Sequence, residues 1–186
     1  MSVRGASAPV VRVLGGRWKG RKLESSPAAR PTSGRARQAL LNLLADRVAG
    51  ARVLDLYAGT GAVGIEMVSR GAARAVLVER DAAPLRRALE RIGAGPDEVR
   101  VVGMAAAEAV AELARKGERF DVVFADPPYA ERPGSAELEG AAGLLSDGGV
   151  FVLQQDARTA APQLQGLALR ERRAYGRNVF FFFGML

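Results

Sequence analysis

Val53-Leu-Asp55-Leu-Tyr57-Ala-Gly59-Thr-Gly61-Ala-Val-Gly64 begins as a short apolar strand and continues into a glycine-rich turn. Helical periodicity follows near residues 62–70, so the segment predicts a strand, a turn and a helix in succession. The glycine spacing, G-x-G-x-x-G, is typical of a backbone that turns tightly at the carboxyl end of a parallel strand and approaches a ligand closely. We therefore expect a ligand site at this turn.

The alternation of strand and helix continues along the chain. Strands are predicted at Val53–Tyr57, Ala75–Glu79, Val99–Gly103, Asp121–Ala125 and Val150–Leu153, and helices near 62–70, 82–92, 105–116 and 135–145. Such alternation predicts an α/β fold with a doubly wound parallel sheet. Only a turn containing Gly176 joins the last strands, Leu167–Tyr175 and Asn178–Phe183, so these two must pair antiparallel. The apolar run Val179–Phe183 indicates a strand buried on both faces.

A small basic unit precedes this pattern. Alternating residues on both sides of Gly15-Gly16 predict a β-hairpin over residues 10–23, and residues 24–34 have the composition of a connector. A helix with a buried face is expected after Pro31, capped by Thr32 or Ser33. We therefore divide the chain into an N-terminal extension, residues 1–34, and a main domain, residues 35–186.

The net charge of +7 is concentrated near the N-terminus. Residues 1–37 carry nine Lys and Arg against one acid, Glu24, whereas the rest of the chain carries 18 bases and 19 acids. A basic arm on a neutral body favours docking on nucleic-acid phosphates, although a solvated basic tail has the same composition. The residues expected to contact nucleic acid are Arg12, Arg17, Trp18, Lys19, Arg21, Lys22, Arg35 and Arg37. For Trp18, packing on the domain is an equal alternative.

Composition excludes several chemistries. The 186 residues include neither Cys nor His, which rules out thiol nucleophiles, iron–sulfur clusters, zinc sites with Cys or His ligands, and His-based triads. No apolar stretch is long enough to span a bilayer, and the N-terminus lacks the pattern of a signal peptide. We expect a cytoplasmic monomer that needs no metal.

Asp55 bears on which ligand the glycine turn holds. The glycine spacing and Glu79, twenty residues beyond Gly59, fit a nicotinamide dinucleotide. A carboxylate at the end of the strand, however, would face the anionic pyrophosphate. S-adenosylmethionine carries an ammonium and a sulfonium and has no phosphate, so it suits Asp55 better. Glu79 can accept hydrogen bonds from the ribose hydroxyls of either ligand.

Asp126-Pro127-Pro128-Tyr129 directly follows a predicted strand and therefore lies at the same sheet edge. The two prolines remove two N–H donors, which leaves the Asp126 carboxylate and the carbonyl groups as acceptors. Acceptors without donors suit an exocyclic amine, because they bind its N–H groups and direct its lone pair to an electrophile. Tyr129 offers a flat face on which a base can stack.

Taken together, these motifs resemble those of class I S-adenosylmethionine-dependent methyltransferases that modify amino groups of nucleobases. Within that class, Arg12-Val-Leu-Gly-Gly-Arg-Trp-Lys-Gly-Arg-Lys-Leu23 and Arg30-Pro-Thr-Ser-Gly-Arg-Ala-Arg37 resemble the bacterial 16S rRNA guanine-N2 methyltransferase family D. The resemblance implies a seven-stranded, Rossmann-like sheet with a terminal antiparallel hairpin. It also implies methyl transfer to a guanine N2 in 16S rRNA, with an assembled or assembling small ribosomal subunit as the partner.

The resemblance further implies residue roles. Asp126, Pro127, Pro128 and Tyr129 would hold the guanine. The cofactor-binding residues would be Arg30, Thr32, Asp55, Tyr57, Gly59, Gly61, Glu79, Arg80, Met104, Ala105 and Asp126. Many relatives bind the adenine amino group with an Asp after the third strand of the main domain. Here Met104 and Ala105 follow that strand, so backbone groups would replace this Asp.

Three other functions are alternatives for the same residues. The same tetrapeptide serves adenine N6 or cytosine N4 in DNA or RNA, although a DNA enzyme usually has a separate target-reading domain. A catalytically silent ribosome assembly factor would keep the fold without turnover, and an intact Asp126 argues against it. An NAD-dependent oxidoreductase is disfavoured by Asp55 and by the lack of an evident acid or base at a hydride site.

Overall fold

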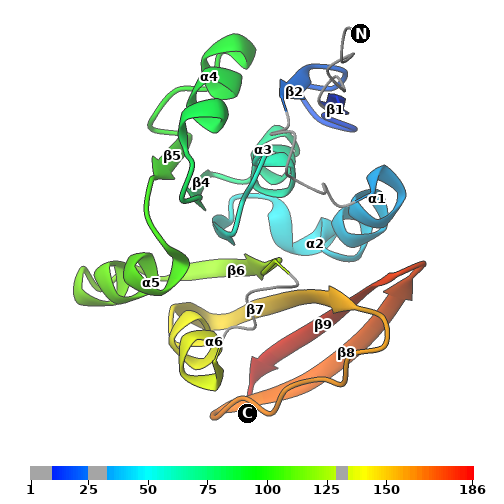
Figure 1. Cartoon of the computed structure of the whole chain (residues 1–186), viewed down its shortest axis with the longest axis vertical. Coiled ribbons are helices and arrows are strands. Elements are labelled where there is room, and N and C mark those ends of the chain that lie inside the picture. The colour runs from blue at the N-terminus through cyan, green and yellow to red at the C-terminus, as the bar shows by residue number, and fades with distance from the viewer. Residues whose placement is uncertain (1–9, 25–32, 129–133) are drawn as a thin grey trace, which may run out of the picture.

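The computed structural model describes residues 10–24, 33–128 and 134–186. Within them, a seven-stranded sheet has the order β5-β4-β3-β6-β7-β9-β8 (Figure 1). The strands are β3 (Arg52–Leu56), β4 (Arg74–Val78), β5 (Val99–Val102), β6 (Phe120–Ala125), β7 (Leu145–Asp156), β8 (Leu167–Tyr175) and β9 (Asn178–Met185). The pairs among β3 to β7 are parallel, and β9 runs antiparallel to both β7 and β8. The predicted doubly wound, mostly parallel sheet with a terminal hairpin is confirmed.

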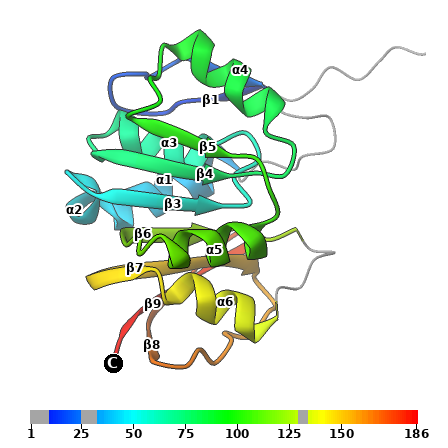
Figure 2. The ribbon, with the colours of Figure 1, turned by 90° about the vertical axis from the view of Figure 1, so that its left-hand side faces the viewer.

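Helices cover both faces of the sheet. They are α1 (Gly34–Leu43), α2 (Ala45–Val48), α3 (Ala62–Ser69), α4 (Ala83–Ile92), α5 (Ala106–Arg115) and α6 (Ser135–Ala142). Side chains of α1 to α4 share one hydrophobic cluster with one face, and those of α5 and α6 share a second cluster with the other. Figure 2 shows α5 and α6 in front of the sheet and α1 and α3 behind it. Among the described residues, no helix is long and apolar enough to cross a membrane.

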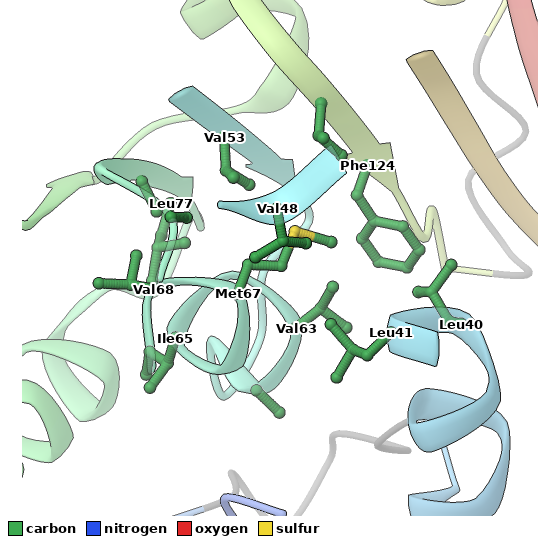
Figure 3. Packing of buried hydrophobic residues seen from close by; sticks show 14 of the residues in the cluster. Leu40, Leu41, Val48, Val53, Val63, Ile65, Met67, Val68, Leu77 and Phe124 are labelled. Carbon is green, nitrogen blue, oxygen red and sulfur yellow. The ribbon is translucent and has the colours of Figure 1, made fainter. Parts of the chain in front are cut away.

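The core explains why the strand sequences are almost wholly apolar. Successive residues of a strand point to opposite faces, so Phe124 of β6 packs with α1 and α3 while Val123 belongs to the cluster of α5 and α6. Figure 3 shows Phe124 beside Leu40 of α1 and near Val63 and Met67 of α3. The run 179–183 divides in the same way between the two clusters, so the predicted burial on both faces is confirmed.

Most predicted strand boundaries differ from the structure by one or two residues, and two of the differences have a clear backbone cause. The strand predicted at Val150–Leu153 is β7, which begins at Leu145 and carries a register shift against β6 between Phe120 and Val122. Gly148, with a φ of 73°, indicates a turn by its sequence but lies inside this irregular strand. The strand predicted to end at Tyr57 ends at Leu56, because Tyr57 adopts a φ of 60°, outside the extended region.

The N-terminal hairpin forms, but its predicted two-residue turn is wrong. Strands β1 (Val10–Arg12) and β2 (Lys22–Glu24) pair antiparallel, and residues 13–21 connect them. Gly15-Gly16 instead rests on the end of α3, where the Ser69 hydroxyl donates to the Gly15 carbonyl at 2.7 Å. A Cβ on Gly16 would lie 1.8 Å from the Ser69 carbonyl oxygen, so only glycine allows this approach. The loop thereby lies at the amino edge of the sheet, where α3 ends.

Candidate active site

Four strand ends form the candidate site. The strand order reverses between β3 and β6, which is where open α/β sheets bind ligands. The last residues of β3, β4, β5 and β6 are in register between neighbouring strands, so these four strands end at the same edge of the sheet. The residues that follow these strands are Tyr57, Glu79, Gly103 and Asp126. The structure thus brings the predicted Glu79 and Asp126 to one edge, with Asp55 two residues before Tyr57.

The three glycines of the turn have different tasks. Gly59 has a φ of +54°, and nothing lies within 4 Å of the position a Cβ would take. Gly61 also has a positive φ, and a Cβ there would approach Leu85 Cδ1 to 2.5 Å. A Cβ on Gly64 would approach Leu77 Cδ2 to 2.3 Å. Gly59 therefore leaves open space over the turn, whereas the other two permit close packing below it.

Asp55 lies beneath the turn instead of facing that open space. Its side chain is buried, and its Oδ2 accepts a hydrogen bond from the Gly64 N–H at 2.9 Å. Burial is the main cause that raises the pKa of Asp55 to about 7; the Gly64 hydrogen bond opposes it, and Asp126 and Glu79 add to the rise. Asp55 has almost no accessible surface in this structure, and its contact with a ligand stays a prediction. Asp55 positions the turn and adds negative potential below it.

Glu79 supports the turn from the neighbouring strand. Its Oε2 accepts from the Gly59 N–H at 2.8 Å, and its Oε1 accepts from the Asp81 N–H at 3.1 Å. A carboxylate has about four lone-pair sites, so these two bonds leave acceptor capacity for ribose hydroxyls. Glu79 thus fixes the position of Gly59 while it remains half-buried at the site.

Asp126 has a partner that sequence reasoning missed. Gln154 of β7 is buried, and its Nε2 donates to Asp126 Oδ2 at 3.0 Å. Pro127 and Pro128 follow Asp126 and have no N–H, so they add only carbonyl acceptors. The polar pair Gln154-Gln155 directly after an apolar strand was the signal for this partner, because it repeats the pattern of Asp126 after β6.

The other predicted ligand residues are distributed around this edge. Arg80 is exposed beside Glu79, and Met104 and Ala105 lie between β5 and α5, half-buried. The hydroxyl of Tyr57 donates to Glu137 of α6. Three predicted residues, Arg30, Thr32 and Tyr129, lie outside the described residues.

Two of the residues that were expected to contact nucleic acid are buried in this structure. Trp18 packs in the core cluster of α1 to α4. Arg37 forms an ion pair with the buried Glu66, with 3.0 Å between Arg37 Nε and Glu66 Oε2, and also donates to the Arg12 carbonyl at 2.7 Å. Glu66 Oε1 accepts from the Leu14 N–H at 3.0 Å. This buried group ties α1 and the hairpin to α3, a structural role that composition alone does not distinguish from phosphate binding.

The other residues that were expected to contact nucleic acid are exposed, but they divide between two edges of the sheet. Arg12, Lys19, Arg21 and Lys22 belong to the hairpin and its loop. Arg17 forms an ion pair at 2.5 Å with Glu98, which precedes β5 at the amino edge. Arg35 lies in the first turn of α1. Because Arg47, just after α1, donates to Gly148 near the start of β7 at 3.0 Å, the first turn of α1 lies towards the carboxyl edge.

The residues at the carboxyl edge fit a cationic cofactor. Three carboxylates, of Asp55, Glu79 and Asp126, lie close enough for the latter two to raise the pKa of the first, so a bound positive charge would relieve their repulsion. An open glycine turn and a half-buried acceptor for ribose complete the pattern. The fold and this site define an S-adenosylmethionine-dependent methyltransferase.

Comparison with known proteins identifies the family of this chain. It belongs to the family described as Conserved hypothetical protein 95, whose model matches residues 11–184. It is 41% identical to Ribosomal RNA small subunit methyltransferase D of Escherichia coli K12 over 142 residues, covering 75% of this chain and 68% of the relative. A solved protein of Thermus thermophilus, described as hypothetical, is 38% identical with a TM-score of 0.83, covering 95% of this chain and all of that one.

A more distant structure shares only the fold. It is a putative methyltransferase solved in complex with SAH, 13% identical to this chain, with a TM-score of 0.72. The superposition covers 98% of this chain and 57% of that one. The same sheet and helix arrangement thus occurs in a protein that binds the product form of the cofactor.

Proposed function

We propose that this protein transfers a methyl group from S-adenosylmethionine to the exocyclic N2 amine of a guanosine in 16S rRNA, within an assembled or assembling small ribosomal subunit. The observation that carries the proposal is Asp126 at the end of β6, followed by two prolines and held by Gln154. The name of the Escherichia coli relative, a small-subunit rRNA methyltransferase, supports the substrate class.

The cofactor, when bound, supplies an electrophilic methyl group on a sulfonium. The chain's own task is to place a base amine in line with that methyl group, so positioning and electrostatics suffice and no covalent enzyme intermediate is needed. Asp126 and the Pro127 carbonyl would accept the two N–H groups of the amine. The lone pair then points away from these acceptors, and Asp126 or water takes the proton after transfer.

The cofactor would lie over the glycine turn. Gly59 leaves room for it, Glu79 would accept from its ribose hydroxyls, and Met104 and Ala105 would contribute backbone groups to the adenine. The target base must leave its stack to reach Asp126, which favours a loop or single-stranded segment. Tyr129 remains the proposed stacking partner.

The test uses labelled S-adenosylmethionine with small ribosomal particles from cells lacking this enzyme, with protein-free 16S rRNA and with duplex DNA. We expect label in particle RNA that digests to N2-methylguanosine and disappears with Asp126→Ala. The matched control is Asp147→Ala, which removes an exposed carboxylate of β7 outside the site. Label only in DNA, or in N6-methyladenosine, would overturn the proposal. Cofactor binding without transfer would favour a silent assembly factor.

A further inference from the structure

The C-terminal hairpin carries a basic surface that the overall charge count conceals. Beyond residue 37 the chain is nearly neutral, with 18 bases against 19 acids. The turn region of β7, β8 and β9 nevertheless gathers four arginines against two carboxylates. These residues are Arg158, Arg172, Arg173 and Arg177, with Asp156 and Glu171. We name the four arginines the hairpin arginines.

The hairpin arginines lie at the carboxyl edge, where Asp126 lies. Asn178, the residue after Arg177, pairs with Asp156 at the end of β7. The Gln154 amide that donates to Asp126 also lies 3.5 Å from Asn178 Oδ1. A continuous polar path therefore leads from Arg177 through Asn178 and Gln154 to Asp126.

Two of the hairpin arginines, Arg172 and Arg173, lie on opposite sides of the edge strand β8. Arg172 pairs in register with Phe181, which belongs to the α5 and α6 face. Arg173 pairs with Phe180, which belongs to the other face. Cross-strand partners point to the same side of a sheet, so one exposed arginine lies on each side of the strand.

Carboxylates neutralise only part of this surface. Arg158 pairs with Asp156 at 2.8 Å, and Arg173 pairs with Glu171. Among the described residues, neither Arg172 nor Arg177 has a carboxylate within ion-pair distance; Arg172 donates to the Ala157 carbonyl at 3.0 Å. A guanidinium has five N–H donors in a planar fork, so a single carbonyl leaves Arg172 able to bind phosphate.

We propose that the hairpin arginines bind the phosphate backbone of the RNA next to the target base. This inference rests on the proposed RNA substrate. The loop of the N-terminal hairpin, which carries Arg17 and Lys19, lies at the opposite, amino edge of the sheet. It therefore does not reach the nucleotides that would flank Asp126. Arg35 in the first turn of α1 and the hairpin arginines are placed to do so.

An alternative role for these residues is protection of a sheet edge. Charged side chains on an edge strand discourage pairing with another chain, and β8 is an edge strand. The two roles predict different behaviour, because edge protection is unrelated to RNA affinity. Phosphate binding instead makes affinity depend on salt in proportion to the number of contacts.

The test compares three triple variants in binding to labelled protein-free 16S rRNA across a salt series. Arg172→Gln, Arg173→Gln and Arg177→Gln together should make the negative slope of log affinity against log salt shallower by about 2. Each lost single-strand phosphate contact contributes about 0.7 to that slope. The corresponding Arg→Lys triple should keep the slope. The control triple, Arg74→Gln, Arg115→Gln and Arg119→Gln, removes equal charge from exposed positions near the amino edge and should change the slope by less than half as much.

Cofactor binding and thermal stability show whether the variants remain folded. Both should be unchanged in all three triples, measured with S-adenosylhomocysteine and by calorimetry. An equal slope for the Gln triple and the wild type would overturn the inference, as would equal losses in the Gln and control triples. Because binding is measured without methyl transfer, the wild type's failure to methylate RNA would overturn the proposed function independently.

Discussion

Gln154 Nε2 lies 3.0 Å from Asp126 Oδ2, so a buried amide of β7 fixes the carboxylate that follows β6. The donor is neutral, which orients Asp126 without adding a positive charge that would repel a cationic cofactor. The strands β6 and β7 are neighbours in the sheet, and this pairing alone brings two residues 28 positions apart into contact.

Gln154→Leu should lower kcat roughly tenfold to a hundredfold, because a hydrogen bond to a charged group contributes about 1.5–3 kcal/mol. Gln154→Glu should instead move the acidic limb of the pH profile upward, since two adjacent carboxyls share a proton. Single-turnover methyl transfer from about pH 5 to 9 measures both effects. Gln155→Leu is the control, because its side chain points to the other face of β7. An unshifted profile for Gln154→Glu would contradict the positioning role.

Gly59→Ala should weaken cofactor binding at least tenfold, because its Cβ would enter the open space above the turn. The matched control is Gly50→Ala, which also has a positive φ and open surroundings but lies between α2 and β3, away from the site. Each variant should lose about 1–2 kcal/mol of stability from left-handed backbone strain. Calorimetric titration with S-adenosylhomocysteine measures the affinity of each variant for the cofactor product. Equal affinities for the two variants would show that the cofactor does not lie over Gly59.

Arg37→Met should destabilise the protein by about 1.5–3 kcal/mol, because the buried Glu66 loses one charged hydrogen-bond partner and keeps its ion pair with Arg70 at 2.9 Å. Arg35→Met, two residues earlier and exposed, should change the free energy of unfolding by less than about 0.5 kcal/mol. Urea denaturation measures both. If Arg37→Met kept full stability and lost only RNA affinity, Arg37 would be a phosphate ligand after all.

Asp55 should make the protein less stable as the pH rises. Its folded pKa of about 7 lies above the unfolded value of 3.8, so the folded state holds more protons between these values. The free energy of unfolding then falls from about pH 4 to pH 7, by a few kcal/mol at most.

Asp55→Asn removes this titration and can still accept from Gly64. Relative to the wild type, the variant should gain stability as the pH rises from about 4 to 8, in urea denaturation without cofactor. The exposed Asp46→Asn of α2 is the control. A constant difference between wild type and Asp55→Asn across this range would show that Asp55 titrates normally.

The sequence by itself determined the order of elements, the doubly wound sheet and the acidic and glycine-rich strand ends. These follow from local periodicity and from turns that adjacent residues define, and the carboxyl ends of parallel strands necessarily share one edge. Asp126 and Glu79 were therefore assigned correctly to the same edge, and the segment 179–183 to the core.

Only the tertiary structure decided which charges face solvent and which residues meet across strands. Arg37 and Trp18 are buried because α3 presents Glu66 to α1 and Ser69 to the hairpin, contacts between residues about 30 and 50 positions apart. Gln154 reaches Asp126 through strand pairing, and Asp55 is covered by a turn that follows it. Burial and long-range pairing depend on the positions of all elements together, whereas periodicity records only the neighbours of each residue along the chain.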